Sequence, residues 1–105
     1  DWSSDVCSSD LKGAVEGLAR SLAAEWAPAI RVNVIAPSLT DTPLAAALLN
    51  SDLKKEAAAK RHPLQQVGRS EDLAALVAHL LSGHARFMTG QVVRVDGGLS
   101  SVRTF

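Results

Sequence analysis

The stretch Ile30–Ala36, IRVNVIA, decides the fold class that this chain is expected to adopt. It is rich in β-branched residues, it has the length of one strand, and Pro37 and Ser38 follow it directly. Near its end, apolar side chains point to both faces of the predicted strand. Such a strand is typical of a parallel sheet that helices cover on both sides.

An amphipathic helix is predicted before this strand. Its apolar stripe consists of Leu11, Val15, Leu18, Leu22 and Trp26. The helix should end before Pro28, because proline disfavours a helical conformation in the residue that precedes it. A second row on the same helix holds the small residues Gly13, Gly17, Ser21 and Ala24. Spacing alone leaves two interpretations of this row open: close packing on a sheet within one subunit, or a helix–helix interface between subunits.

Two short helices are predicted after the strand. Thr42 is the expected N-cap of the first, with Pro43 at its first helical position and Leu44–Leu49 following. Ser51 is expected to cap the second, a polar helix that ends at Lys60–Arg61. So long a connection between a strand and the next core helix is typical of lids and binding loops.

A further helix and strand are predicted in the last third of the chain. Ser70 is expected to cap the helix and Gly83 to end it, with a buried side made of Leu73, Leu76, Val77, Leu80 and Leu81. Gln91–Val95, QVVRV, has the pattern of a strand. Alternating strands and helices predict an α/β fold with a doubly wound parallel sheet. Because two strands make a poor sheet, we expect the chain to be the C-terminal part of an incomplete domain.

Composition and motifs exclude several classes of function. The 11 basic and 11 acidic residues give a net charge of zero, so no overall field favours a nucleic acid or an anionic membrane as partner. No apolar run approaches the length of about 18 residues that a membrane span needs. The single cysteine, Cys7, favours a cytoplasmic location. The three histidines have no partners at metal-ligand spacing, so no metal site is expected.

Residues 1–11, DWSSDVCSSDL, differ from the rest of the chain, since they hold four serines and no basic residue. The segment resembles the translation of a widely used sequencing-adapter oligonucleotide. On this interpretation residues 1–11 are an artefactual leader, and residues 12–105 are the C-terminal portion of a single domain. The alternative is a polar, frayed terminus.

The turn after the predicted strand at 30–36 is where a ligand is expected, because open α/β sheets bind ligands beyond the carboxyl ends of their strands. Thr40 and Thr42 place hydroxyl groups there. A threonine at a helix N-cap also needs no ligand to explain it. Lys12, at the start of the first helix, is by its position alone an ordinary solvated lysine.

Three longer stretches, in order, resemble the C-terminal part of a short-chain dehydrogenase/reductase. They are KGAVEGLARSLAAEWAP with IRVNVIAPSLTDTP, then HPLQQVGRSEDLAALVAHLLS, then TGQVVRVDGG. The resemblance covers residues 12–103 and implies a Rossmann-type fold, an NAD or NADP cofactor, and hydride transfer between a secondary alcohol and a ketone. It also implies a small-molecule alcohol or ketone substrate, and a homodimer or homotetramer formed through the 12–27 helix of the full-length parent.

The resemblance also implies roles for individual residues. In this family a Tyr-x-x-x-Lys pair stands at the start of this helix; Lys12 matches the lysine, whereas Ser8 holds the position of the tyrosine. A serine hydroxyl is shorter and a far weaker acid than a phenol, so this chain alone is expected to be inactive. The family's turn reads Pro-Gly where Pro37 and Ser38 stand here. Together with Lys12, the expected cofactor contacts are Pro37, Ser38, Thr40 and Thr42.

Two functions from different classes are therefore compatible with the sequence. The first is an oxidoreductase of which this chain is a truncated part. The second is a non-catalytic interaction module that associates through the small-residue face of its first helix.

Overall fold

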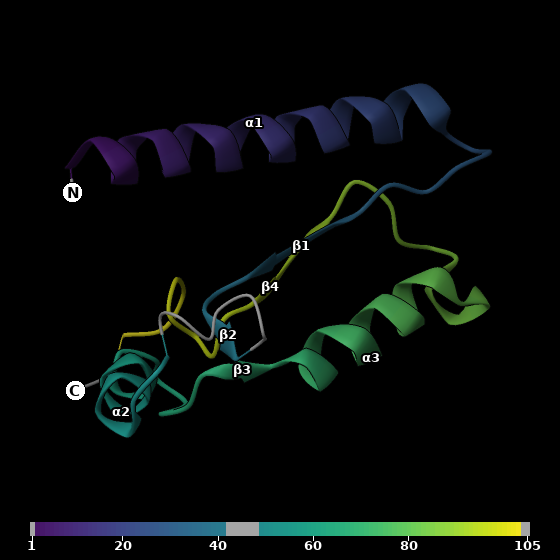
Figure 1. The fold of residues 1–105 in the computed structure, drawn as a ribbon. Coiled ribbons are helices and arrows are strands. Elements are labelled where there is room, and N and C mark those ends of the chain that lie inside the picture. Colours follow the sequence, from purple (N-terminus) through teal and green to yellow (C-terminus); the bar gives the residue numbers. More distant parts are fainter. Residues whose placement is uncertain (1, 42–48, 104–105) are drawn as a thin grey trace.

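The computed structural model describes residues 2–41 and 49–103, and side chains from residue 12 onward within these ranges. Helices and strands alternate along the chain (Figure 1). Two pairs of parallel strands form. The first pair is β1 (Val34–Pro37) with β4 (Val92–Val95), and the second is β2 (Thr40–Asp41) with β3 (Gly68–Arg69). The predicted α/β class with parallel strands is therefore confirmed.

Helices cover both sides of the pair β1 and β4. Figure 1 shows α1 (Trp2–Trp26) along one side and α3 (Ser70–Leu81) along the other. The α1 helix ends at Trp26 as the sequence predicts, but it begins well before the predicted start at Leu11. The register of β1 and β4 pairs Val34 with Val92 and Pro37 with Val95. Both carboxyl ends therefore lie at the same edge of the sheet.

The first strand is shorter than predicted, since β1 begins at Val34 and not at Ile30. Just before it, one backbone hydrogen bond joins the two segments, from the Gly90 N–H to the Val32 carbonyl at 2.7 Å, and side chains add further bonds. The Asn33 amide nitrogen donates to the Met88 carbonyl at 3.2 Å, and the Asn33 amide oxygen accepts from the Gln91 N–H at 3.1 Å. These bonds hold the two segments together without the regular pairing of a strand.

The polar helix α2 (Asp52–Lys60) confirms its predicted N-cap. The Ser51 hydroxyl accepts a hydrogen bond from the Lys54 N–H at 3.1 Å, which satisfies an amide that has no partner within the helix. The predicted helix at Leu44–Leu49 and its N-cap Thr42 lie in the stretch 42–48, outside the described residues, apart from the buried Leu49.

Both ends of α3 differ from the prediction. Ser70 is the first residue of the helix and not its cap. The Asp72 carboxylate accepts from the Arg69 N–H at 2.8 Å and so closes the N-terminal end. At the other end Ser82, and not Gly83, follows the last helical residue, and its hydroxyl donates to the His79 carbonyl at 2.7 Å. A short 3₁₀ helix, η2 (Gly83–Ala85), comes next.

Small side chains dominate the buried core of the described residues. They are Ala19, Ala23, Ala36, Leu49, Ala58, Leu80 and Ala85. The predicted buried side of α3 is confirmed at Leu80 and wrong at Val77 and Leu81, which are 41% and 80% exposed. A hollow of about 320 Å³ lies between these residues and Arg31–Asn33 with Ile35. The predicted stripe of α1 is also largely exposed, since Val15, Leu18 and Trp26 are 48%, 60% and 42% exposed.

The row of small residues on α1 does not pack against the described chain. Apart from the helix's own backbone and the two chain neighbours, no described atom lies within 4 Å of the position that a Cβ would take at Gly13 or at Gly17. Ala19 and Ala23 face the sheet instead and are buried. Close packing on a sheet within the described residues therefore does not account for these two glycines.

No helix in the described part of the chain is both long and apolar enough to cross a membrane.

Candidate cofactor site at the carboxyl ends of the strands

The carboxyl ends of β1 and β4 lead into two turns that lie side by side. Ser38 follows Pro37 at the end of β1, and its N–H donates to the Val95 carbonyl at 3.3 Å. Asp96 follows Val95 at the end of β4. This edge is where doubly wound sheets bind their ligands, because helix N-termini and loop amides gather there.

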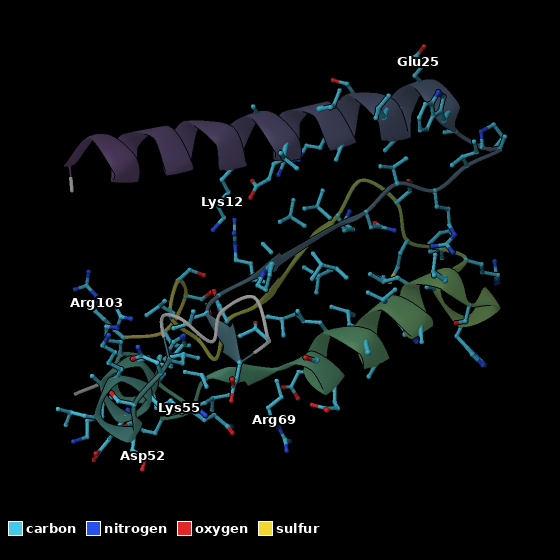
Figure 2. All side chains as sticks on the ribbon, viewed as in Figure 1. Lys12, Glu25, Asp52, Lys55, Arg69 and Arg103 are labelled. Atoms are coloured by element: carbon cyan, nitrogen blue, oxygen red, sulfur yellow. The ribbon has the colours of Figure 1, made fainter. Side chains whose placement is uncertain are left out.

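Lys12 extends from α1 toward this edge. Figure 2 shows its side chain pointing from the helix to the side where β1 and β4 lie. Lys12 and Pro37 line one hollow of about 420 Å³, together with Val15, Glu16 and Val34–Ala36. The structure therefore brings together two of the residues that the sequence assigns to the cofactor, although 25 positions of the chain separate them.

An ion pair fixes the helix that carries Lys12. Glu16 lies one helical turn after Lys12, and its Oε1 is 3.6 Å from Nη1 of Arg94 on β4. The Glu16 side chain is 17% exposed, so its carboxylate is partly desolvated. Among the described side chains, the ion pairs do not include Lys12. Its side chain lines the hollow described above.

Ser38 and Thr40 turn their hydroxyl groups away from this hollow. The Ser38 hydroxyl lies 2.9 Å from Nε2 of His62, and the Thr40 hydroxyl donates to the Ser38 carbonyl at 3.1 Å. Thr40 also lies against β3, because a Cβ at Gly68 would meet its Oγ1 at 3.2 Å. To contact a ligand beside Lys12, the Ser38 hydroxyl would have to leave His62, and the Thr40 hydroxyl would have to leave the Ser38 carbonyl.

Two of the predicted site residues have no described side chain. Ser8, which holds the expected tyrosine position, lies on α1 one turn before Lys12, and only its backbone is described. Thr42 lies outside the described residues.

His62 is the residue at this edge that the sequence did not reveal. It is 2% exposed, and it is the buried polar side chain of the described residues. Its Nδ1 lies 2.8 Å from the Ala58 carbonyl oxygen. The local sequence around His62 and Pro63 does not show that His62 is buried at this edge, because its partner Ser38 lies 24 positions earlier in the chain.

The turn after β4 packs against His62 and Pro63. Gly97 and Gly98 have φ angles of +60° and +89°. A Cβ at Gly98 would lie 3.2 Å from the Pro63 ring. Asp96 closes the turn by accepting from the Gly98 N–H at 3.0 Å and from the Ser100 hydroxyl. The Ser100 hydrogen bond, more than the other contributions, holds the pKa of Asp96 below its ordinary value of 3.8.

No group of three or more His, Cys, Asp or Glu side chains among the described residues could hold a metal ion. The donors at this edge are instead an ammonium group and backbone amides, which suit the hydroxyls and carboxamide of a nucleotide cofactor.

Comparison with known proteins identifies the family of this chain. The sequence matches the family model described as enoyl-(acyl carrier protein) reductase over residues 4–100. This chain belongs to the short-chain dehydrogenase/reductase family. It is 45% identical over 93 residues to a tropinone reductase homolog from Arabidopsis thaliana, a match that covers 88% of this chain and 35% of that protein.

Solved structures of the family share the fold. A gluconate 5-dehydrogenase from Burkholderia cenocepacia, in complex with NADP and tartrate, is 34% identical with a TM-score of 0.77. The match covers 88% of this chain and 36% of that one. A 4-hydroxyisoleucine dehydrogenase complexed with NADH is 29% identical with a TM-score of 0.80, over 88% of this chain and 38% of that one. The fold is therefore part of a Rossmann-type domain, as expected. The chain spans about a third of the length of the curated relatives it matches.

Proposed function

We propose that this chain is the C-terminal part of an NAD- or NADP-dependent oxidoreductase that transfers hydride between a secondary alcohol and a ketone. The observation that carries the proposal is the hollow shared by Lys12 and Pro37 at the carboxyl edge of β1. Relatives with the same fold hold NADP or NADH, which supports a nicotinamide cofactor here. The substrate is a small alcohol or ketone.

Lys12 has two roles in this proposal. Its ammonium donates hydrogen bonds to the ribose hydroxyls at the nicotinamide end of the cofactor. Its positive charge also lowers the pKa of a tyrosine at the position that Ser8 holds here, so that the phenol can exchange a proton with the substrate oxygen near neutral pH. When bound, the cofactor supplies or accepts the hydride. Pro37 offers an apolar surface beside the hollow, and the backbone at Pro37–Ser38 would meet the carboxamide.

The sequence of this chain does not contain two of the features that the proposed reaction needs. Ser8 does not replace the tyrosine, because an aliphatic hydroxyl has a much higher pKa than a phenol and reaches less far. The phosphate-binding pattern G-x-G-x-x-G is also absent from the sequence. We therefore propose that the chain is inactive by itself, that residues 1–11 derive from adapter DNA, and that the longer native protein carries the tyrosine.

The exposed small-residue face of α1 supports a proposal for assembly. Gly13 and Gly17 have no neighbour within 4 Å of their Cβ positions among the described atoms. A second helix can approach closely at such a face, since no side chain holds it away. We propose that the longer protein forms a homodimer or homotetramer through the 12–27 helix and acts in the cytoplasm. The same face supports the alternative of a non-catalytic interaction module.

One experiment separates these possibilities. The DNA upstream of the codon for Lys12 is sequenced from its natural source, and the resulting longer protein is titrated with NADH and NADPH by calorimetry beside the 105-residue chain. The proposal predicts a tyrosine codon in place of Ser8, cofactor binding by the longer protein, and none by the chain alone. A start codon immediately before Lys12, or a longer protein that binds neither cofactor, would support the interaction module instead.

A further inference from the structure

His62 and Ser38 form a buried contact at the edge where the cofactor is proposed to bind. We propose that His62 is a positioning residue for the nicotinamide end of this site: it holds the Ser38 hydroxyl and thereby fixes the turn that follows β1. The inference rests on the proposed function, because the turn matters to the cofactor only if the site binds one. Neither residue touches the reacting atoms in this proposal.

The hydrogen bonds determine where the proton of the imidazole sits. Nδ1 of His62 lies 2.8 Å from the Ala58 carbonyl oxygen, which can only accept. In the neutral form of the ring, Nδ1 therefore carries the proton. Nε2 is then an acceptor, and the Ser38 hydroxyl at 2.9 Å donates to it. Both ring nitrogens are satisfied, as a side chain that is 2% exposed requires.

The ring connects three separate parts of the chain. Ala58 belongs to α2, Ser38 follows β1, and Gly97 follows β4. A Cβ at Gly97 would meet the His62 side chain at 3.5 Å, so the ring packs directly under the β4 turn. The Leu64 N–H also donates to the Gly97 carbonyl at 3.1 Å, which holds the segment that carries His62 against the same turn.

Ser38 connects the buried His62 to the proposed cofactor hollow. It is bonded covalently to Pro37, which lines the hollow with Lys12. Its own N–H donates to the Val95 carbonyl, and its carbonyl accepts from Thr40. With the hydroxyl held by His62, all polar groups of Ser38 are engaged. Loss of the His62 contact leaves a partly buried hydroxyl without its partner and frees the turn beside Pro37 to move.

The test uses the longer native protein and three variants that separate the two nitrogen contacts. In His62→Gln, the side-chain oxygen comes close to the former position of Nε2 and can still accept from Ser38. In His62→Asn, the amide nitrogen comes close to the former position of Nδ1 and can bond Ala58, but nothing reaches Ser38. Ser38→Ala removes the donor. His84→Asn is the matched control, because His84 is exposed and no side-chain hydrogen bond is found for it.

Ser38→Ala and His62→Asn should each raise the cofactor Kd and KM about three- to tenfold, the range for one lost hydrogen bond, while kcat changes less than about twofold. His62→Gln and His84→Asn should stay close to the wild type. The double variant Ser38→Ala with His62→Asn should be no worse than the poorer single variant. Nitrogen NMR of the wild type should show His62 protonated at Nδ1.

Three outcomes contradict the account, and they are distinguishable. If the wild-type longer protein binds no nicotinamide cofactor, the proposed function fails and this inference fails with it. If the wild type binds cofactor while Ser38→Ala and His62→Asn keep its affinity and KM, the inference alone is overturned. If His62→Gln is as impaired as His62→Asn, the ring acts through its packing and not through Ser38, which also overturns the inference.

Discussion

Glu16 of α1 and Arg94 of β4 form an ion pair with 3.6 Å between Oε1 and Nη1. Because Glu16 lies one turn after Lys12, this contact sets where the Lys12 side chain stands relative to the carboxyl edge of the sheet. Lys12, Glu16, Arg94 and Ser100 also border a common hollow of about 420 Å³, on the side of Lys12 that faces the β4 turn. The pair therefore links the helix with the predicted catalytic lysine to the strand that ends at the site.

Breaking this ion pair should weaken the attachment of α1. We expect Glu16→Gln in the longer native protein to lower the free energy of unfolding by about 1 kcal/mol, the upper end for partly exposed pairs. Urea unfolding at low ionic strength measures the effect. The control is Glu25→Gln on the same helix, whose side chain Figure 2 shows directed away from the sheet. Equal effects of the two substitutions would show that Arg94 does not hold the helix.

The hydrogen bond between Ser100 and Asp96 should be visible in the titration of Asp96. The bond holds the pKa of Asp96 below its ordinary value of 3.8 in the folded state, so it stabilises the ionised carboxylate. Its contribution to stability is fully present above the unfolded pKa and is lost as the pH falls through the lowered folded pKa.

Ser100→Ala should therefore raise the pKa of Asp96 toward its ordinary value and leave a smaller loss of stability on acidification below about pH 4. Carboxyl NMR during an acid titration gives the pKa directly. Ser101→Ala is the control, since Ser101 makes no hydrogen bond to Asp96 among the described contacts. An unchanged pKa in Ser100→Ala would contradict the stated cause.

Gly98 should tolerate substitution much less than Gly83. At Gly98 the φ angle is +89°, and a Cβ would press on the Pro63 ring at 3.2 Å. Gly98→Ala should therefore cost about 1–2 kcal/mol of unfolding free energy, since L-residues disfavour this conformation by that amount. Gly83→Ala is the matched control, because nothing lies within 4 Å of its Cβ position. Similar melting temperatures for both variants would contradict the turn geometry described here.

The isolated 105-residue chain should not form a stable monomer. Leu18, Ile30, Val77 and Leu81 are between 41% and 80% exposed, and such apolar surface favours association. We expect aggregation or a state without a cooperative thermal transition, measured by light scattering and calorimetry. A sharp melt from a monodisperse monomer would contradict this expectation.

Local signals in the sequence predicted several elements correctly. Ser51 caps α2 because a serine before a polar helical run satisfies a free amide, and that pattern needs no distant partner. The strand predicted at Gln91–Val95 is β4, with a difference of one residue at its start. The end of α1 before Pro28 follows from proline itself.

The predictions that failed depended on contacts between distant segments. β1 begins at Val34 because regular pairing with β4 begins there, and spacing along the chain does not reveal where a distant partner strand begins. Val77 has the correct spacing for the buried side of α3, but it borders the hollow shared with Arg31–Asn33 and Ile35 and is 41% exposed. The contact between Ser38 and His62 joins residues 24 positions apart. Only the folded turn after β1 shows that a histidine without metal-ligand spacing is part of this edge.

The role of Lys12 is the central claim, and the pH dependence of ketone reduction tests it most directly. In the longer protein with the proposed tyrosine, kcat and KM are measured across pH for the wild type, Lys12→Ala and Lys12→Arg. The control is Lys60→Ala, whose lysine pairs with Glu56 on α2 and does not line the hollow. Each pKa unit that the Lys12 charge provides to the tyrosine is worth about 1.36 kcal/mol, or a tenfold change.

Lys12→Ala should lose at least about tenfold in kcat/KM near neutral pH and shift the rate profile toward higher pH, because the tyrosine pKa rises without the neighbouring charge. Lys12→Arg should recover part of the activity, since it keeps the charge but presents its donors as a planar fork. Lys60→Ala should match the wild type. Full activity of Lys12→Ala with an unshifted profile would contradict the assignment of Lys12 and, with it, the proposed catalytic function of this edge.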